Sequence, residues 1–258
     1  MSSHFTLYMA GQTDVGLARD HNEDAISWDF NRGLAMLADG MGGHNAGDVA
    51  SRMCLEKLDI ILTTALDKSL GNIRPNKDVS REATLVRRAV NKANIAVFEN
   101  ALDNQDRKGM GTTLVVTLFH ESKVVVAHVG DSRVYRLRSN TLEQMTDDHS
   151  LVRELLEKGA ISAEEAVDNP YSHVITRAVG IRPRVAVETH EYDVLPGDTF
   201  LLCSDGLTDK VSDKAIEETL VAAEGRWERA AQRLIDLANN EGGHDNISVI
   251  LVGVGVKR

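Results

Sequence analysis

The N-terminal part of the chain follows the two-residue period of a β-strand. Apolar and polar side chains alternate over residues 5–9, and two apolar runs, 25–28 and 34–37, flank a turn-forming segment that ends at Gly33. Alternation predicts half-buried strands, and a glycine-containing turn between two such runs predicts a hairpin. We therefore expect a first strand followed by a β-hairpin.

The period then changes to that of an α-helix. Apolar residues have helical spacing from Gly47 to about Leu66, and they recur every three or four positions from Val86 to Val97 in a second segment. The sequence predicts two long helices in succession.

Strand-like patterns return in the middle of the chain. Four apolar runs separated by turn-like segments cover residues 113–119, 124–129, 134–137 and 142–145. Short strands with tight connections predict a meander of antiparallel strands. Residues 147–180 are charged and irregular, with short helical stretches near 151–158 and 163–167, and we interpret this segment as an inserted flap.

The C-terminal part resumes regular patterns. Residues 185–194 and 199–203 flank the turn Pro196-Gly197-Asp198, which predicts another strand pair. Two helical segments and a final buried strand follow, at 214–223, 226–239 and 246–254. Runs of strands and pairs of helices indicate an α+β fold, in which two antiparallel sheets pack face to face with helices outside. We expect one domain over residues 1–258, since this length suits a single core and no internal repeat is visible.

Composition narrows the classes of protein that fit. Hydrophobic residues make up 42% of the chain and charged residues 26%, which is typical of a globular protein. The net charge of -10 repels phosphate backbones and disfavours binding to nucleic acid or to an anionic membrane. No signal-peptide pattern or membrane-length apolar run is visible, and Cys54 and Cys203 lie in apolar stretches, so we expect buried thiols in the reducing cytoplasm.

Aspartates stand at the ends of the predicted strands. Asp39, Asp131 and Asp205 each follow an apolar run, whereas Asp24 and Asp245 each precede one. In an antiparallel sheet the start of one strand lies beside the end of its neighbour. The hairpin should therefore bring Asp24 close to Asp39. The same geometry predicts that Asp245 lies at the same rim of the sheets, where strands begin and end, as Asp131 and Asp205.

Carboxylates that crowd together repel one another unless cations lie between them. The predicted donors are all hard oxygens, with no cysteine cluster and no paired histidines, which favours Mg²⁺ or Mn²⁺ over zinc. Glycines after Asp39 and Asp205 let the backbone approach an ion closely. The alternative for any single Asp-Gly pair is an ordinary turn.

The order of these motifs resembles that of the bacterial metal-dependent protein phosphatases, the PPM or type-2C serine/threonine family. The matching segments are residues 16–24, 38–47, 111–113, 129–133, 146–150, 204–207 and 245–246. The resemblance implies an αββα sandwich with an inserted flap and a dinuclear Mn²⁺ or Mg²⁺ site. It also implies a hydrolase that removes phosphate from phosphoserine and phosphothreonine in signal transduction and opposes a serine/threonine kinase.

The resemblance assigns roles to the metal-site residues. It implies that Asp39 bridges both ions, that Asp205 and Asp245 complete the first site, and that the carbonyl of Gly40 helps to hold the second ion. Two ions held in this way acidify a water molecule for attack on phosphorus.

The same resemblance assigns further residues to indirect contacts with the metals or to a third ion. It implies that Glu23 and Asp24 act through metal-bound waters, and that Asp131 holds a third, weaker ion with Asp205, assisted by Asp209. The only departure from the family motifs is Asp48, where many relatives carry glutamate, and we expect no effect on the chemistry.

Two side chains are candidates for direct catalysis. Arg19 offers a planar, two-pronged donor for the phosphoryl oxygens, and its alternative is a solvated surface arginine. His44 is placed to protonate the departing serine or threonine oxygen, and its alternative is a hydrogen bond to metal-bound water. We assign His21 a structural role and leave Thr112 and Thr113 out of the site, because β-branched residues at a strand start need no further explanation.

Other classes of protein remain as alternatives. A non-catalytic pseudo-phosphatase that binds phosphoproteins would tolerate loss of metal ligands, but Asp39, Asp205 and Asp245 are all present. A two-metal nuclease would need a basic surface, which the acidic composition disfavours. We expect a monomer whose partners are phosphorylated proteins, including a kinase and its substrates.

Overall fold

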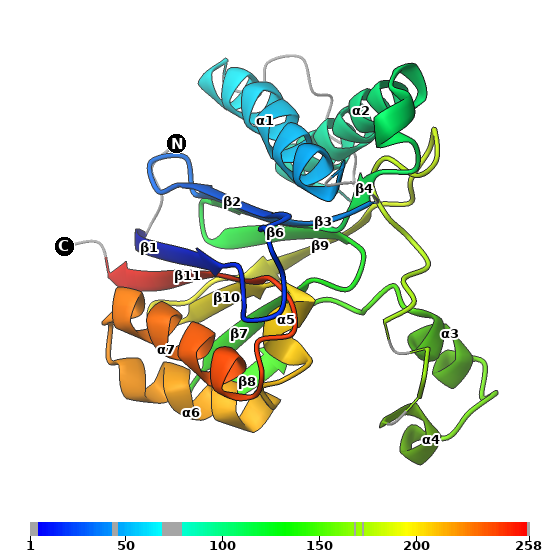
Figure 1. Ribbon diagram of the computed structural model, residues 1–258. Coiled ribbons are helices and arrows are strands. Elements are labelled where there is room, and N and C mark those ends of the chain that lie inside the picture. Colours follow the sequence, from blue (N-terminus) through cyan, green and yellow to red (C-terminus); the bar gives the residue numbers. More distant parts are fainter. Residues whose placement is uncertain (1–4, 43–45, 69–78, 168, 172, 257–258) are drawn as a thin grey trace.

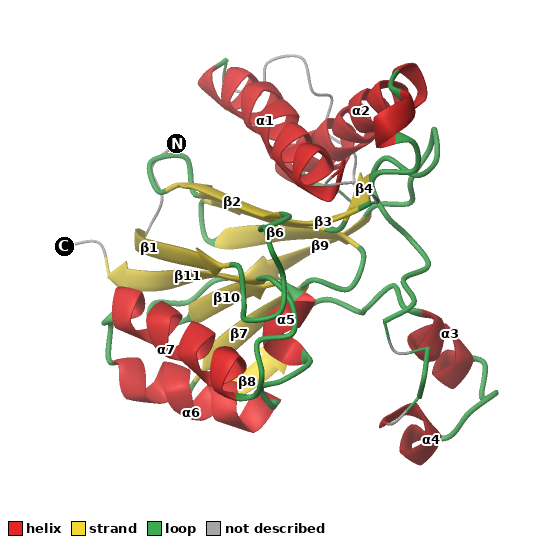
Figure 2. Ribbon diagram, viewed as in Figure 1, coloured by secondary structure: helices red, strands yellow, loops and turns green. Residues whose placement is uncertain are grey.

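Two β-sheets stacked between two pairs of helices form the four layers of the structure (Figure 1). The computed structural model describes residues 5–42, 46–68, 79–167, 169–171 and 173–256. The colouring by secondary structure in Figure 2 shows the sheets in the middle and the helices on the two outer faces.

The first sheet has the strand order β2-β3-β5-β6-β9, with a short strand, β4, paired to the end of β3. Its strands are β2 (Asp24–Asp29), β3 (Leu34–Met41), β4 (Gly111–Thr112), β5 (Leu114–His120), β6 (Lys123–Val129) and β9 (Glu188–Asp193). Helices α1 (Ala46–Asp67) and α2 (Arg81–Asp103) cover its outer face (Figure 1).

The second sheet has the strand order β1-β11-β10-β7-β8. Its strands are β1 (Phe5–Asp14), β7 (Arg133–Arg138), β8 (Thr141–Gln144), β10 (Thr199–Cys203) and β11 (Ile247–Val256). Helices α6 (Asp213–Ala223) and α7 (Trp227–Asn240) cover its outer face, and the short α5 (Asp205–Thr208) follows β10 directly (Figure 1).

Strand β3 shows how the apolar pattern produces these layers. Leu34, Met36 and Ala38 pack in the cluster that includes α1 and α2, whereas Ala35 and Leu37 pack in the cluster between the two sheets. Successive side chains of a strand point to opposite faces, so a strand buried on both faces needs a continuous apolar run. Burial on both faces therefore explains why residues 34–38 show no polar alternation.

The expected hairpin, the two long helices and the C-terminal helices are all present close to the predicted bounds. The predicted meander is wrong at one point, because β5 pairs with β6 and β7 pairs with β8, but β6 and β7 lie in different sheets. The connection 130–132 carries the chain from one sheet to the other. A tight turn between apolar runs does not reveal this crossing.

The predicted pairing of 185–194 with 199–203 is also wrong. Strand β9 pairs with β6, whereas β10 pairs with β7 and β11. The turn between them bonds to other strands, since Gly197 N donates to the carbonyl of Val254 and the Asp198 carboxylate pairs with Arg138 at 2.6 Å. The apolar β10 requires a central position, and the polar, half-exposed β9 takes an edge.

The segment predicted as a flap leaves the layers between β8 and β9. It contains α3 (Leu151–Glu157) and α4 (Ala163–Val167), which project away from both sheets (Figure 1).

Three short elements were not predicted from the sequence: β4, α5 and the 3-10 turn η1 (Gln105–Arg107). Among the helices that the structure describes, none combines the length and the apolar character needed to cross a membrane.

Candidate metal centre

Carboxylates from both sheets meet at one end of the sandwich. They line a cavity of about 540 Å³ that also contains Gly40. The carboxylates on its wall are Glu23, Asp39, Asp131, Asp205, Asp209 and Asp245. The predicted convergence of strand ends on a single rim is therefore present in the fold.

Four of these aspartates lie at or next to strand ends. Asp39 lies near the end of β3, Asp205 directly follows Ser204 after β10, and Asp245 lies two residues before β11. Asp131 lies in the connection by which the chain passes from β6 to β7. The cavity therefore lies where the two sheets meet.

Asp24 lies behind this rim. It is the direct register partner of Asp39 in the β2–β3 hairpin, as the sequence predicted. Its side chain is buried, accepts a hydrogen bond of 2.9 Å from Ser204 Oγ, and is absent from the described residues that line the cavity. Burial, followed by the charges of Asp205 and Asp245, raises the pKa of Asp24 to about 7.

The backbone of Asp39 is held by two threonines, Thr112 at the end of β4 and Thr113 between β4 and β5. Asp39 N donates to Thr113 Oγ1 at 3.1 Å, and the carbonyl of Asp39 accepts from Thr113 N at 2.8 Å and from Thr112 Oγ1 at 2.8 Å. Thr113 Oγ1 also lies 2.6 Å from Ser132 Oγ, beside Asp131. Thr113 therefore links the backbone positions of two cavity carboxylates, a role that the sequence did not reveal.

Gly40 and Gly47 allow close approach of the backbone around Glu23. A Cβ on Gly40 would lie 2.1 Å from the carbonyl oxygen of Gly47, and a Cβ on Gly47 would lie 2.7 Å from Cδ of Glu23. Any side chain at either position would displace the wall of the cavity. The glycines thus allow the β3 backbone, the start of α1 and the Glu23 carboxylate to occupy one small space.

Asn246 anchors the loop that carries Glu23. Its Oδ1 accepts from Glu23 N at 2.7 Å, and its Nδ2 donates to the carbonyls of Val15 and His21 at 2.9 and 3.0 Å. Because Asn246 follows Asp245 directly, one short segment positions both Glu23 and a cavity carboxylate.

Burial and mutual repulsion raise the pKa values of the cavity carboxylates. Burial, followed by the charges of Asp24, Asp205, Asp131 and Asp245, raises the pKa of Asp39 well above its usual range. Burial and neighbouring acids raise the pKa values of Asp205 and Asp131 too. Carboxylates in such an arrangement are stabilised by cations between them.

The donor set fits hard divalent cations. Every donor on the wall that carries negative charge is an oxygen, and the close approach of Gly40 leaves its backbone unobstructed by a side chain. Mg²⁺ and Mn²⁺ prefer ligands of this kind. The residues present therefore fit the metals that the sequence predicts.

Arg19 lies at the same cavity and contacts one of the acids. Its Nη2 donates to Oδ2 of Asp245 at 2.7 Å, and half of its side chain is exposed. The structure places Arg19 on the wall of this cavity, with an ion-pair partner that was not predicted. His44 falls outside the described residues.

The end of the flap also lines the cavity. His173 and Ile175 line it, and His173 Nδ1 lies 3.1 Å from Oδ2 of Asp209. Burial raises the pKa of Asp209, while His173 lowers it. Asp209 therefore connects the flap to the wall that carries Asp205.

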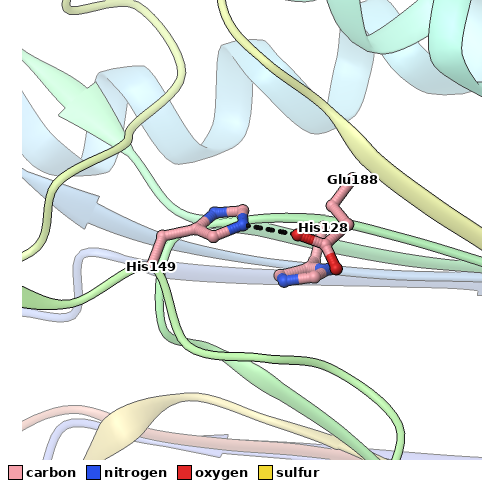
Figure 3. Close-up of side chains that lie close together, drawn as sticks. All are labelled: His128, His149 and Glu188. Carbon is pink, nitrogen blue, oxygen red and sulfur yellow. Dashed lines mark hydrogen bonds and ion pairs between the residues drawn. The ribbon is translucent and has the colours of Figure 1, made fainter. Parts of the chain in front are cut away.

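A second group of metal-type donors lies outside this cavity. His128, His149 and Glu188 place one nitrogen or oxygen each within 4.8 Å of one another (Figure 3). The two rings are stacked, with centroids 4.5 Å apart and an interplanar angle of 16°. This histidine pair, which the sequence analysis did not anticipate, joins β6 to the start of the flap.

Hydrogen bonds show that this group is not arranged for a metal. Gly130 N donates to Nδ1 of His149, so the neutral ring carries its proton on Nε2, which lies 3.2 Å from Glu188 Oε2. A cation at Nε2 would force the proton onto Nδ1, against the Gly130 donor. The Arg177 guanidinium, 3.1 Å from the same Nε2, adds repulsion toward a cation.

Comparison with known proteins agrees with this geometry. A family model described as Protein phosphatase 2C matches residues 18–251. The serine/threonine phosphatase stp of Listeria welshimeri is 42% identical over 244 residues, which cover 93% of each protein. Crystal structures extend the likeness to three dimensions.

Two solved structures illustrate it. Serine/threonine phosphatase Stp1 from Staphylococcus aureus superposes with a TM-score of 0.86 at 36% identity, covering 98% of this chain and 97% of that chain. The catalytic domain of the serine/threonine protein phosphatase PstP, in complex with two manganese ions, gives a TM-score of 0.82 at 36% identity, covering 97% and 99%.

Proposed function

This chain belongs to the protein phosphatase 2C family, and we propose that its carboxylate-lined cavity is the dinuclear centre at which phosphoserine and phosphothreonine are hydrolysed. The chain is a metal-dependent serine/threonine protein phosphatase. The observation that carries the assignment of the site is the meeting of carboxylates from both sheets in one cavity. The finer roles below are part of the proposal.

The wall of the cavity supplies the donors that we propose as metal ligands. Asp39, Asp205, Asp245 and the carbonyl of Gly40 would hold two tight ions, and Asp131 with Asp205 would hold a third, weaker one. Two divalent cations held there supply the Lewis acidity that lowers the pKa of water and neutralises the charge of the phosphoryl group. Mn²⁺ and Mg²⁺ both suit these donors.

The remaining side chains of the site bind the phosphoryl group, orient water and supply a proton. Arg19 is half exposed at the cavity, so its guanidinium can turn from Asp245 to the phosphoryl oxygens and bind two of them at once. Glu23 lines the cavity and orients water there, while Asp24 supports the rim from behind through Ser204. His44 donates the proton that the departing serine or threonine oxygen requires.

The cysteines and the net charge bear on where the protein acts and on what it binds. We propose that the four layers and the flap act as one phosphatase domain, a monomer in the cytoplasm that opposes a serine/threonine kinase. The two cysteines are free and buried, and burial raises the pKa of each thiol to about 12, as suits a reducing compartment. The net charge of -10 supports a protein partner over nucleic acid.

Phosphate release from phosphothreonine peptides tests the proposal. We expect turnover with Mn²⁺ or Mg²⁺, none with excess chelator, and recovery when the metal is restored; calorimetry with each metal counts the tight sites. Tight binding of two ions without turnover on peptides or p-nitrophenyl phosphate would instead support a pseudo-phosphatase. Turnover unaffected by chelator would overturn the dinuclear assignment.

A further inference from the structure

A second cavity lies beside the carboxylate-lined one. It measures about 620 Å³ and is formed mainly by residues 175–186, where the chain leaves the flap and returns to β9. Met41 and Ile175 line both cavities. A polypeptide bound at the carboxylates therefore has this second cavity within reach of its neighbouring side chains.

The charge of the second cavity is opposite to that of the first. Arg177, Arg182 and Arg184 line it, and its one acidic side chain, Glu154, pairs with Lys158 at 3.3 Å. Within the part of the chain that the structure describes, Arg182 and Arg184 have no acidic partner within ion-pair distance, and both are exposed. In a protein with a net charge of -10, this is a local concentration of unneutralised guanidinium groups.

The backbone beneath these arginines is fixed. Asn94 of α2 is fully buried; its Oδ1 accepts from Gly180 N at 2.8 Å and its Nδ2 donates to the carbonyl of Arg182 at 3.0 Å. Val179 exchanges two backbone hydrogen bonds with Thr112, which also holds Asp39. The arginines are thus carried by a segment tied to the same residues that hold the metal centre.

The conformation of Gly180 supports this attachment. Its φ of +89° lies in the left-handed region, and a Cβ would lie 2.4 Å from Cγ1 of Val97. A side chain at this position would therefore lift the segment from α2. Preorganised backbone with free charged side chains is an arrangement suited to binding an anion.

We propose that this cavity, which we term the arginine cavity (Arg177, Arg182 and Arg184), binds an anionic side chain of the substrate close in sequence to the phosphorylated residue being hydrolysed. This inference rests on the proposed function. The anion is a carboxylate or a second phosphate group, since a guanidinium binds either through paired hydrogen bonds. A phosphate carries more charge and binds more strongly.

Peptide kinetics test the proposal. One phosphothreonine peptide with neutral flanks is compared with versions that carry a single aspartate, or a single non-hydrolysable phosphoserine analogue, at each neighbouring position. We expect kcat/KM to rise about tenfold for the best-placed anion, roughly the effect of one charge-assisted hydrogen bond. The relative gain from aspartate and from the phosphoserine analogue identifies which anion the cavity takes.

A double variant, Arg182→Gln with Arg184→Gln, assigns the effect to the cavity. We expect it to bring the ratio of kcat/KM between anionic and neutral peptides close to one. The matched control is Arg229→Gln with Arg233→Gln, two exposed arginines on α7 that make the same change in charge on the opposite face of the sandwich. The control should keep the wild-type ratio.

Three results would overturn the inference: no preference for anionic peptides in the wild type, the same loss of preference in the control, or an equal loss on neutral and anionic peptides in the double variant. Each leaves the phosphatase assignment intact, because hydrolysis of the neutral peptide is measured in the same series. Failure to hydrolyse any peptide with Mn²⁺ would contradict the proposed function itself.

Discussion

The backbone N–H of Gly130 donates a hydrogen bond of 3.1 Å to Nδ1 of His149. Gly130 precedes Asp131 on the cavity wall, and His149 stands at the start of the flap. The reverse bond, from His149 N to the carbonyl of Gly130, measures 3.0 Å. A neutral imidazole thus links the start of the flap to the connection that carries Asp131, one of the cavity carboxylates.

The burial of His149 makes the stability of the fold depend on pH. Burial, followed by the neighbouring His128, lowers the pKa of His149 to about 4, with Arg177 lowering it further and Glu188 opposing. In the unfolded chain the pKa is about 6.5, so below that pH the unfolded state binds more protons than the folded state. We expect the free energy of unfolding to fall by about 2 kcal/mol between pH 7 and pH 5 on account of His149.

The variant His149→Asn isolates this effect, because its Oδ1 can still accept from Gly130 but does not titrate. Urea denaturation between pH 7 and about pH 5 should show a shallower decline for the variant than for the wild type. Parallel declines would show that other groups, such as the cavity carboxylates, account for the whole pH dependence.

Asp39→Asn should abolish turnover at any attainable Mn²⁺ concentration, because Asp39 is proposed to bridge both ions. In chelator, the same variant should be more stable than the wild type at pH 7, since one of several mutually repelling carboxylates is gone. Thermal unfolding and isothermal calorimetry measure both effects. Wild-type turnover with two tight ions would refute the bridging role.

Asp131→Ala should keep two tight metal sites and reduce kcat by about tenfold, or about 1.4 kcal/mol in activation free energy, because only the third ion is proposed to depend on it. Calorimetric titration with Mn²⁺ distinguishes this from a general collapse of the site. If the tight sites disappear with Asp131, it belongs to the dinuclear pair.

His44→Ala should slow phosphopeptide hydrolysis by about 10²-fold or more and slow p-nitrophenyl phosphate hydrolysis much less, because only the alkoxide leaving group needs a proton. The Mn²⁺ affinity of the variant is the control. Equal losses on both substrates would assign His44 to positioning metals or their waters.

Thr113→Val should weaken the site, because it removes the acceptor for Asp39 N and the contact with Ser132. The lost hydrogen bond costs about 1–3 kcal/mol, seen as lower stability and lower Mn²⁺ affinity. Thr117→Val is the matched control: Thr117 is buried on β5, and its hydroxyl has no hydrogen-bond partner among the described residues. Identical behaviour of the two variants would remove Thr113 from the metal centre.

Local pattern was enough to predict most of the elements of this fold. The β2–β3 hairpin and the α1–α2 pair depend on apolar spacing and on one turn, all within short stretches of sequence. Whether β9 and β10 pair with each other or join different sheets depends on partners distant in the chain. A turn such as 196–198 is compatible with both arrangements. The polar composition of β9 was the available signal, because an edge strand tolerates it and a central strand does not.

Some residues of the candidate site could be identified from local sequence, and others could not. Asp39, Asp205 and Asp245 could be found because each adjoins an apolar strand and because antiparallel pairing brings strand ends together. Thr113 and Asn246 could not be assigned, since a threonine at a strand start and an asparagine in a loop have ordinary explanations. Their roles depend on hydrogen bonds to residues far away in sequence.

Asp39 belongs to one sheet of the sandwich, whereas Asp205 and Asp245 adjoin strands of the other. Cations held between them, as we propose, would join the two layers of the sandwich. Binding to the folded state alone adds about 2.7 kcal/mol of stability when the free metal concentration is 100 times Kd. Resistance to proteolysis should therefore rise with Mn²⁺ in stepped titrations, and a shortage of Mn²⁺ and Mg²⁺ together should shorten the lifetime of the protein as well as stop its catalysis.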